Sequence, residues 1–104
     1  MKIAVSSGTE NGLEAEVSSH FGRCPYFTIV EIENGDVKNF EVVKNPFFES
    51  HGQPGELPEF IKNLGVEIVV AGGIGQRAII YFEKLGIKTI TGVSGKIKDI
   101  LKLI

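Results

Sequence analysis

A short segment, residues 19–27, contains the side chains best suited to chemistry. It includes His20, Arg23 and Cys24, and Cys24 is the only cysteine of the chain. Imidazole and thiolate groups bind soft or borderline metals such as iron, copper and zinc, and Arg23 adds a fixed positive charge between them. Gly22 and Pro25 both disfavour a continuous helix, so we expect a loop that leads into a strand and presents these donors.

Two other interpretations of this segment remain open on spacing alone. His20 would be a loop histidine bonded to backbone and Cys24 a small buried apolar group, as free cysteines often are. Alternatively, Cys24 would be a nucleophile with His20 or His51 as its base. Such a nucleophile requires an oriented third group, and the sequence offers none. We therefore expect that the protein is not an enzyme.

A glycine-rich turn at residues 72–75 is the second candidate feature. Residues 73–78 match the form of a dinucleotide-binding loop, but that site also requires an acidic residue about 20 positions further on. Residues 91–94 contain no acidic side chain, so we reject dinucleotide binding. Two interpretations remain for the turn. Its amides attract an anion at a helix N-terminus, or its glycines only allow tight packing between a strand and a helix.

Composition limits the class of protein. The chain has 104 residues, of which 42% are hydrophobic and 23% charged, so we expect one globular domain over residues 1–104. The net charge of −2 and the absence of a basic run argue against nucleic-acid binding. A single cysteine excludes an internal disulfide, and no segment is typical of a signal peptide or a membrane span. We expect a cytoplasmic protein that does not bind membranes.

Hydrophobic periodicity predicts the elements that position these residues. Strands are expected at 2–6, 26–33 and 37–43, with a long loop at 7–19 and a tight turn at 34–36 that makes the last two strands a hairpin. A loop at 45–55 contains His51. Helices are expected at 56–64 and 76–85, buried strands at 67–71 and 87–90, and a last helix with Ser94 as its N-cap.

The resulting order is βββαβαβα. Strands that alternate with helices require parallel crossovers, whereas the hairpin adds antiparallel strands. The sequence therefore predicts one mixed sheet with helices on its faces, in an α/β fold.

Residues across the whole chain resemble the dinitrogenase iron-molybdenum cofactor biosynthesis family, which includes the X and Y accessory proteins of nitrogen fixation and the C-terminal domain of the B accessory protein. The resemblance rests on the stretches 20–23 (HFGR), 45–46 (NP), 51–52 (HG) and 71–75 (AGGIG), with Phe27 after the first. It implies a three-layer ribonuclease H-like fold with a mixed five-stranded sheet. It also implies non-catalytic binding and carriage of an iron-sulfur or iron-molybdenum cluster.

The resemblance also assigns roles by position. His20 and Arg23 match the family loop and His51 matches the histidine of the middle loop, whereas the motif does not fix the position of Cys24. The implied metal ligands are His20, Cys24 and His51, with Arg23, Gly72, Gly73 and Gly75 facing the negative charge of the cluster.

Three donors are fewer than the four protein ligands of a standard iron-sulfur cluster. Binding would then be labile, shared across a homodimer, or completed by other ligands on a preassembled cluster, and labile binding suits exchange with cluster donor and acceptor proteins. The alternative function is a small-anion or metabolite-binding regulatory module that uses the glycine-rich turn and Arg23, with Cys24 as packing.

Overall fold

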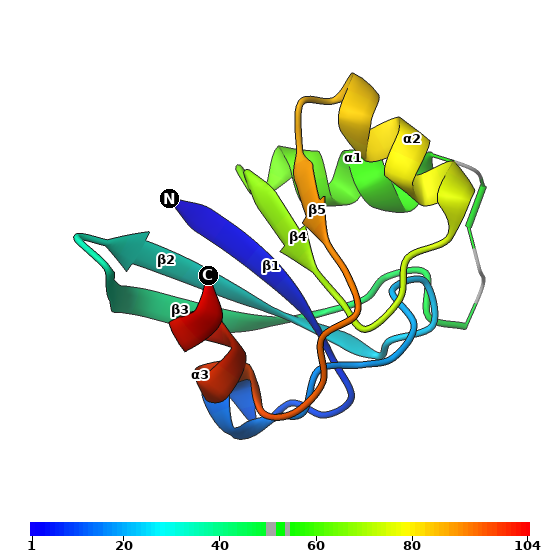
Figure 1. The fold of residues 1–104 in the computed structure, drawn as a ribbon. Helices are drawn as coiled ribbons and strands as arrows, with labels where there is room; N and C mark the ends of the chain where they lie inside the picture. Colours follow the sequence, from blue (N-terminus) through cyan, green and yellow to red (C-terminus); the bar gives the residue numbers. More distant parts are fainter. Residues whose placement is uncertain (50–51, 54) are drawn as a thin grey trace.

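A mixed five-stranded sheet forms the middle layer of the computed structural model, which describes residues 1–49, 52–53 and 55–104. The strand order is β3-β2-β1-β4-β5, in which β1 is antiparallel to β2 and parallel to β4. The strands are β1 (Lys2–Ser7), β2 (Tyr26–Glu33), β3 (Asp36–Lys44), β4 (Ile68–Val70) and β5 (Lys88–Ile90). The predicted mixed sheet is therefore confirmed (Figure 1).

The hairpin of β2 and β3 is also confirmed. Asn34 and Gly35 connect the two strands with φ angles of 55° and 83°. Two consecutive positive φ angles are typical of the type I′ turn, whose twist matches that of the flanking strands. The pairing shifts register between Glu31 and Ile32, so the far end of the hairpin bends away from regular pairing.

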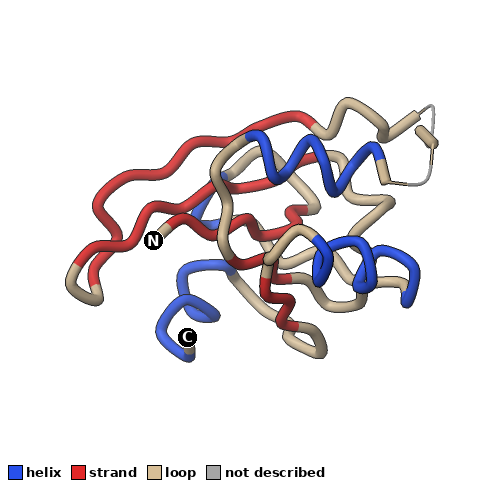
Figure 2. Tube along the Cα trace, turned by 90° about the horizontal axis from the view of Figure 1, so that it is seen from above, coloured by secondary structure: helices blue, strands red, loops and turns tan. Residues whose placement is uncertain are grey.

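Two helices cover one face of the sheet. They are α1 (Glu56–Asn63) and α2 (Gln76–Lys84), and they lie side by side, well away from α3 (Figures 1 and 2). Between them and the sheet is a core rich in aromatic side chains, including Phe21, Phe27 and Phe82. The rings of Phe21 and Phe82 meet edge to face with centroids 5.2 Å apart. This core lies directly beneath the loop that contains His20.

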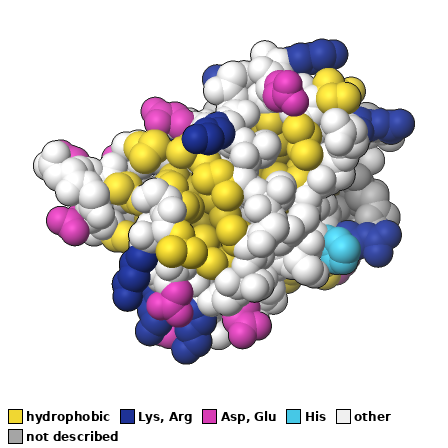
Figure 3. All heavy atoms as spheres, viewed as in Figure 1, with side chains coloured by type: hydrophobic (Ala, Val, Ile, Leu, Met, Phe, Trp, Pro, Cys, Tyr) yellow, Lys and Arg dark blue, Asp and Glu magenta, His cyan; other side chains and the backbone are white. Residues whose placement is uncertain are grey.

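Short elements cover the opposite face, which completes three layers. They are the 3₁₀ helix η1 (Gly12–Glu14), the one-turn helix α3 (Ile97–Ile100) and the 3₁₀ helix η2 (Leu101–Leu103). Apolar side chains of β1 and β4 pack beneath them. Apolar surface remains visible over the middle of this face (Figure 3).

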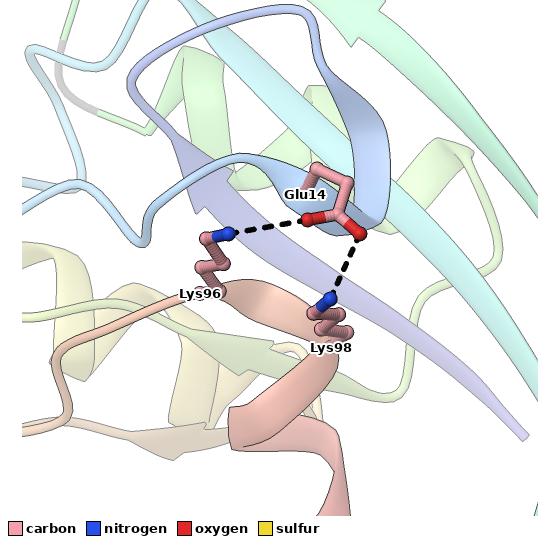
Figure 4. A network of polar contacts seen from close by, with 3 residues as sticks. All are labelled: Glu14, Lys96 and Lys98. Carbon is pink, nitrogen blue, oxygen red and sulfur yellow. Dashed lines mark hydrogen bonds and ion pairs between the residues drawn. The ribbon is translucent and has the colours of Figure 1, made fainter.

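An ion-pair network ties η1 to α3. The Glu14 carboxylate contacts Lys98 Nζ at 2.9 Å and Lys96 Nζ at 3.4 Å (Figure 4). The two lysines lower the pKa of the Glu14 carboxyl and Glu14 raises the pKa of Lys98. All three side chains are exposed, so the network orients the elements but contributes little stability in salt.

The last helix differs from the prediction. Its N-cap is Lys96 rather than Ser94, and no side chain caps it. Gly95 has a φ of 107°, outside the helical region, so a helix cannot run through from Ser94. Lys96 is extended and bridges to Glu16, and α3 begins only at Ile97. Part of the predicted loop at 7–19 is likewise ordered as η1.

Among the described residues, no helix combines the length and the apolar character needed to cross a membrane.

Candidate functional site

Three loops gather at one end of the sheet. Because β1 and β4 are parallel neighbours, the loops that follow them leave the same edge, and the β2–β3 hairpin returns to that edge at Lys44. The β1–β2 loop, the segment after β3 and the β4–α2 turn therefore meet there (Figure 1). In open α/β sheets, ligands bind outside the carboxyl ends of the strands.

Backbone hydrogen bonds join the β1–β2 loop to the glycine-rich turn. The Gly72 amide donates to the Ser18 carbonyl and the Phe21 amide donates to the Gly73 carbonyl, each at 2.9 Å. A Cβ at Gly72 would lie 2.8 Å from Ser19 Cα, which is closer than atoms pack. Gly72 therefore serves the tight packing of the turn, and its predicted cofactor contact remains a prediction.

Four of the predicted site residues line one open pocket of about 410 Å³. They are His20, Arg23, Gly73 and Gly75, and the rest of the lining is Phe21, Gly22 and Ile74. His20 and Arg23 are exposed. Figure 3 shows a histidine beside a basic side chain at this end of the molecule. The structure thus brings together residues that are more than 50 positions apart in sequence.

The backbone of His20 is held while its ring is left open. Ser18 Oγ accepts the His20 N–H at 3.3 Å and lies 3.2 Å from the His20 carbonyl, to which it donates. No hydrogen bond to the His20 imidazole occurs within the described part of the chain. The ring is therefore available to a ligand, and the interpretation that the backbone binds this imidazole finds no partner there.

At two glycines of the pocket, neither the φ angle nor the packing requires glycine. Neither Gly22 nor Gly75 has a positive φ angle, and a Cβ on either would meet no atom within 4 Å. Gly75 is the N-cap of α2, and in the described residues the amides of 76–78 donate no hydrogen bond. The missing side chains leave the main chain open, so a ligand with negative charge can approach it closely.

Cys24 lies in the core beneath the pocket. Its side chain is fully buried, and Sγ donates to the Phe21 carbonyl at 3.1 Å. Burial raises the pKa of the Cys24 thiol to about 12, and a metal ligand must be a thiolate. In this conformation Cys24 contacts no solvent, so the packing interpretation that the sequence left open fits the geometry better than metal binding.

The remaining predicted ligand, His51, lies outside the described residues. Within 1–49, 52–53 and 55–104, no three His, Cys, Asp or Glu side chains converge as a metal site. The described residues therefore do not form a metal centre with three or more protein ligands around His20.

Asn45, a residue to which the sequence motifs gave no role, lies at the junction of two loops. The side chain is buried; Nδ2 donates to the Cys24 carbonyl at 2.8 Å, and Oδ1 accepts the Phe47 N–H at 2.9 Å. An Asn-Pro pair directly after a strand is typical of such a turn, and this was the available signal. Asn45 fixes the segment after β3 against the loop that contains His20.

The fold and this pocket define a small three-layer α/β protein with an open, positively charged site at the carboxyl ends of its parallel strands. The chain belongs to the dinitrogenase iron-molybdenum cofactor family, whose model matches residues 1–104. The family relationship that the sequence motifs predicted is thereby confirmed.

Three similar proteins share the sequence or the fold of this chain. The protein PH0822, known from a crystal structure, is 49% identical in sequence to this chain. The two structures match with a TM-score of 0.89, over 98% of this chain and 87% of PH0822. An uncharacterized protein of Methanocaldococcus jannaschii is 39% identical over 84% of this chain and 75% of its own length. The apo form of the orange protein from Desulfovibrio gigas, at 22% identity, shares the fold with a TM-score of 0.85 over 97% of this chain and 83% of that one.

Proposed function

We propose that the protein binds and carries an iron-sulfur or iron-molybdenum cluster, or a precursor of one, without catalysing a reaction on it. The observation that supports this most is the convergence of His20, Arg23, Gly73 and Gly75 on one open pocket, in a chain of the iron-molybdenum cofactor family. The cluster is cargo in this proposal.

The pocket fits such cargo chemically. The exposed His20 imidazole supplies one bond to iron, and imidazole is a suitable iron ligand. Arg23 and the open amides at the start of α2 stabilise the negative charge of a cluster. Gly22 and Gly75 leave room for its surface. His51 is the second donor that we propose.

Weak ligation is part of this mechanism. With Cys24 in the core, this chain offers a cluster at most two histidine ligands. The remaining iron sites then keep the non-protein ligands of a preassembled cluster or are bound by a second copy of the chain. Few protein bonds favour rapid release, which suits transfer from a donor protein to an acceptor protein. We expect this transfer in the cytoplasm, where a single thiol stays reduced.

The test is an anaerobic titration of the purified protein with an isolated iron-molybdenum or iron-sulfur cluster, followed by visible absorbance and iron content. We expect saturable binding that His20→Ala weakens about tenfold, because one metal bond is lost. Arg23→Gln should weaken it less, since it removes charge only. Lys102→Gln, a matched charge change at η2, should bind like the wild type.

Two further variants refine the ligand set. Cys24→Ala should bind cluster like the wild type, because the thiol is buried away from the pocket. His51→Ala tests the second proposed donor and should weaken binding further in combination with His20→Ala. Binding that is indifferent to both His20→Ala and Arg23→Gln would contradict the proposed site.

One observation favours a second candidate function. Within the described residues the amides of 76–78 donate no hydrogen bond, and Arg23 lines the same pocket as Gly75, so a small anion without any metal suits this place. A protein that takes up no cluster, yet is stabilised against heat by phosphate in an Arg23-dependent manner, would be such an anion-binding regulatory module.

A further inference from the structure

A second hollow adjoins the pocket at His20. Its volume is about 300 Å³, which is at the lower end of the range for small-molecule sites. It lies between α1, α2 and the segment after β3. The lining is mostly apolar and aromatic: Phe21, Gly22, Phe47, Gln53, Gly55, Leu57, Pro58, Gly75, Arg77, Ala78 and Tyr81.

Packing holds the aromatic walls of this hollow in place. A Cβ at Gly55 would lie 3.0 Å from the Tyr81 ring, so the ring rests directly on that backbone. Phe47 meets Phe60 edge to face with centroids 6.5 Å apart, and Phe21 is fixed against Phe82. The walls therefore exist before a ligand arrives, which lowers the entropic cost of binding.

The charge along the described lining of the hollow is positive. Arg77 is the charged residue among the described lining residues, and it lies in the first turn of α2. No salt bridge to Arg77 is formed within the described residues. The neighbouring Glu56 is not part of the lining, and its Oε1 accepts the Gln53 N–H at 2.7 Å. The site therefore combines an apolar body with a positive rim.

We propose that this hollow binds a small organic anion, with a ring-sized apolar body against Phe47 and Tyr81 and its carboxylate at Arg77. Among the described lining residues there is no carboxylate, thiol or imidazole, so this part of the hollow offers a metal ion no ligand. A bare inorganic anion would leave the aromatic walls uncovered. The site goes beyond the cluster-carrier function, since it uses Arg77 rather than Arg23 and requires no cluster.

The test is a titration of the ¹⁵N-labelled, cluster-free protein with phenylacetate, monitored by the amide signals of Gly75 and Ala78. Phenethylamine carries the opposite charge on the same ring, and acetate carries the charge without the ring. We expect saturable shifts with phenylacetate alone. Arg77→Gln should weaken binding about tenfold, as expected for one charged hydrogen bond, and Arg77→Lys should recover part of it.

A steric variant makes the site assignment specific. Ala78→Leu should fill the hollow and abolish the shifts, with its spectrum otherwise overlaying that of the wild type. If Ala78→Leu perturbs the fold, Arg77→Gln still decides the question. Equal binding of phenethylamine, absence of saturation, or indifference to Arg77→Gln would overturn the proposal.

Failure here is separable from failure of the carrier function. His20→Ala should bind phenylacetate like the wild type, because His20 does not line this hollow. The cluster titration and the phenylacetate titration therefore test different residues.

Discussion

At the residue scale, Cys24 in the core beneath the pocket has a strongly raised thiol pKa. Burial raises its thiol pKa from an ordinary 9.0 to about 12, so the neutral thiol is favoured in the folded protein. The corresponding stability is fully present below the unfolded pKa and is lost as pH rises towards the folded pKa. Between the two pKa values, the free energy of unfolding falls by about 1.4 kcal/mol per pH unit.

This predicts an alkaline loss of stability that depends on Cys24. Between about pH 8 and about pH 10.5, the free energy of unfolding of the wild type should fall by about 2 kcal/mol more than that of Cys24→Ala. Urea unfolding of both proteins at each pH measures the difference, and lysine and tyrosine titration cancels in the comparison. Parallel pH curves would mean that the thiol is ionised as readily in the fold as outside it.

Gly72 packs against backbone atoms of the β1–β2 loop, which leave no room for a side chain. A Cβ added at Gly72 would lie 2.8 Å from Ser19 Cα and 3.1 Å from the Ser18 carbonyl oxygen, and both of these are backbone atoms. Gly72→Ala should therefore lower the free energy of unfolding by about 1–3 kcal/mol through overpacking. Gly22→Ala is the matched control in the β1–β2 loop that packs against this turn, and it should cost under about 1 kcal/mol, because its Cβ meets nothing. Equal costs in urea unfolding would refute the packing role.

At the scale of elements, one side chain joins the segment after β3 to the β1–β2 loop. Asn45→Ala leaves the Cys24 carbonyl and the Phe47 N–H without their partner. We expect a loss of about 1–3 kcal/mol in unfolding free energy and weaker cluster binding, because the two loops lose their relative placement. The exposed Asn39→Ala on β3 should change neither. A stable Asn45→Ala protein with normal cluster binding would show that the loops are positioned independently.

The helices and strands were largely predictable from the sequence because the apolar residues of each recur with a clear helical or strand period. The boundaries of β2 follow from alternation and the Asn34-Gly35 turn, and α1 from its apolar spacing and first-turn Pro58. The last helix was not predictable in the same way. The spacing of its apolar residues predicted the helix correctly. Gly95, however, adopts a positive φ angle, so the helix begins only at Ile97. The spacing of apolar residues carries no information about the φ angle of a single residue.

At the scale of the whole molecule, the candidate site depends on which strands are neighbours. The residue types pointed to His20, Arg23 and the glycine turn, but their meeting follows from the parallel pairing of β1 with β4. The burial of Cys24 could not be inferred from spacing. It results from the aromatic core of Phe21, Phe27 and Phe82, which forms only in the folded chain.

The central place of β1 also has a consequence for synthesis on the ribosome. β1, β2 and β3 are consecutive and antiparallel, so this meander can assemble as soon as residues 2–44 have emerged. The other edge of β1 must wait for β4, more than 60 residues after β1 begins. At about 5–20 residues per second, translation leaves that edge unpaired for seconds. An apolar strand with an open edge invites pairing with a neighbouring nascent chain, so the same strand that organises the finished sheet is the point most exposed to misassembly while the chain is being made.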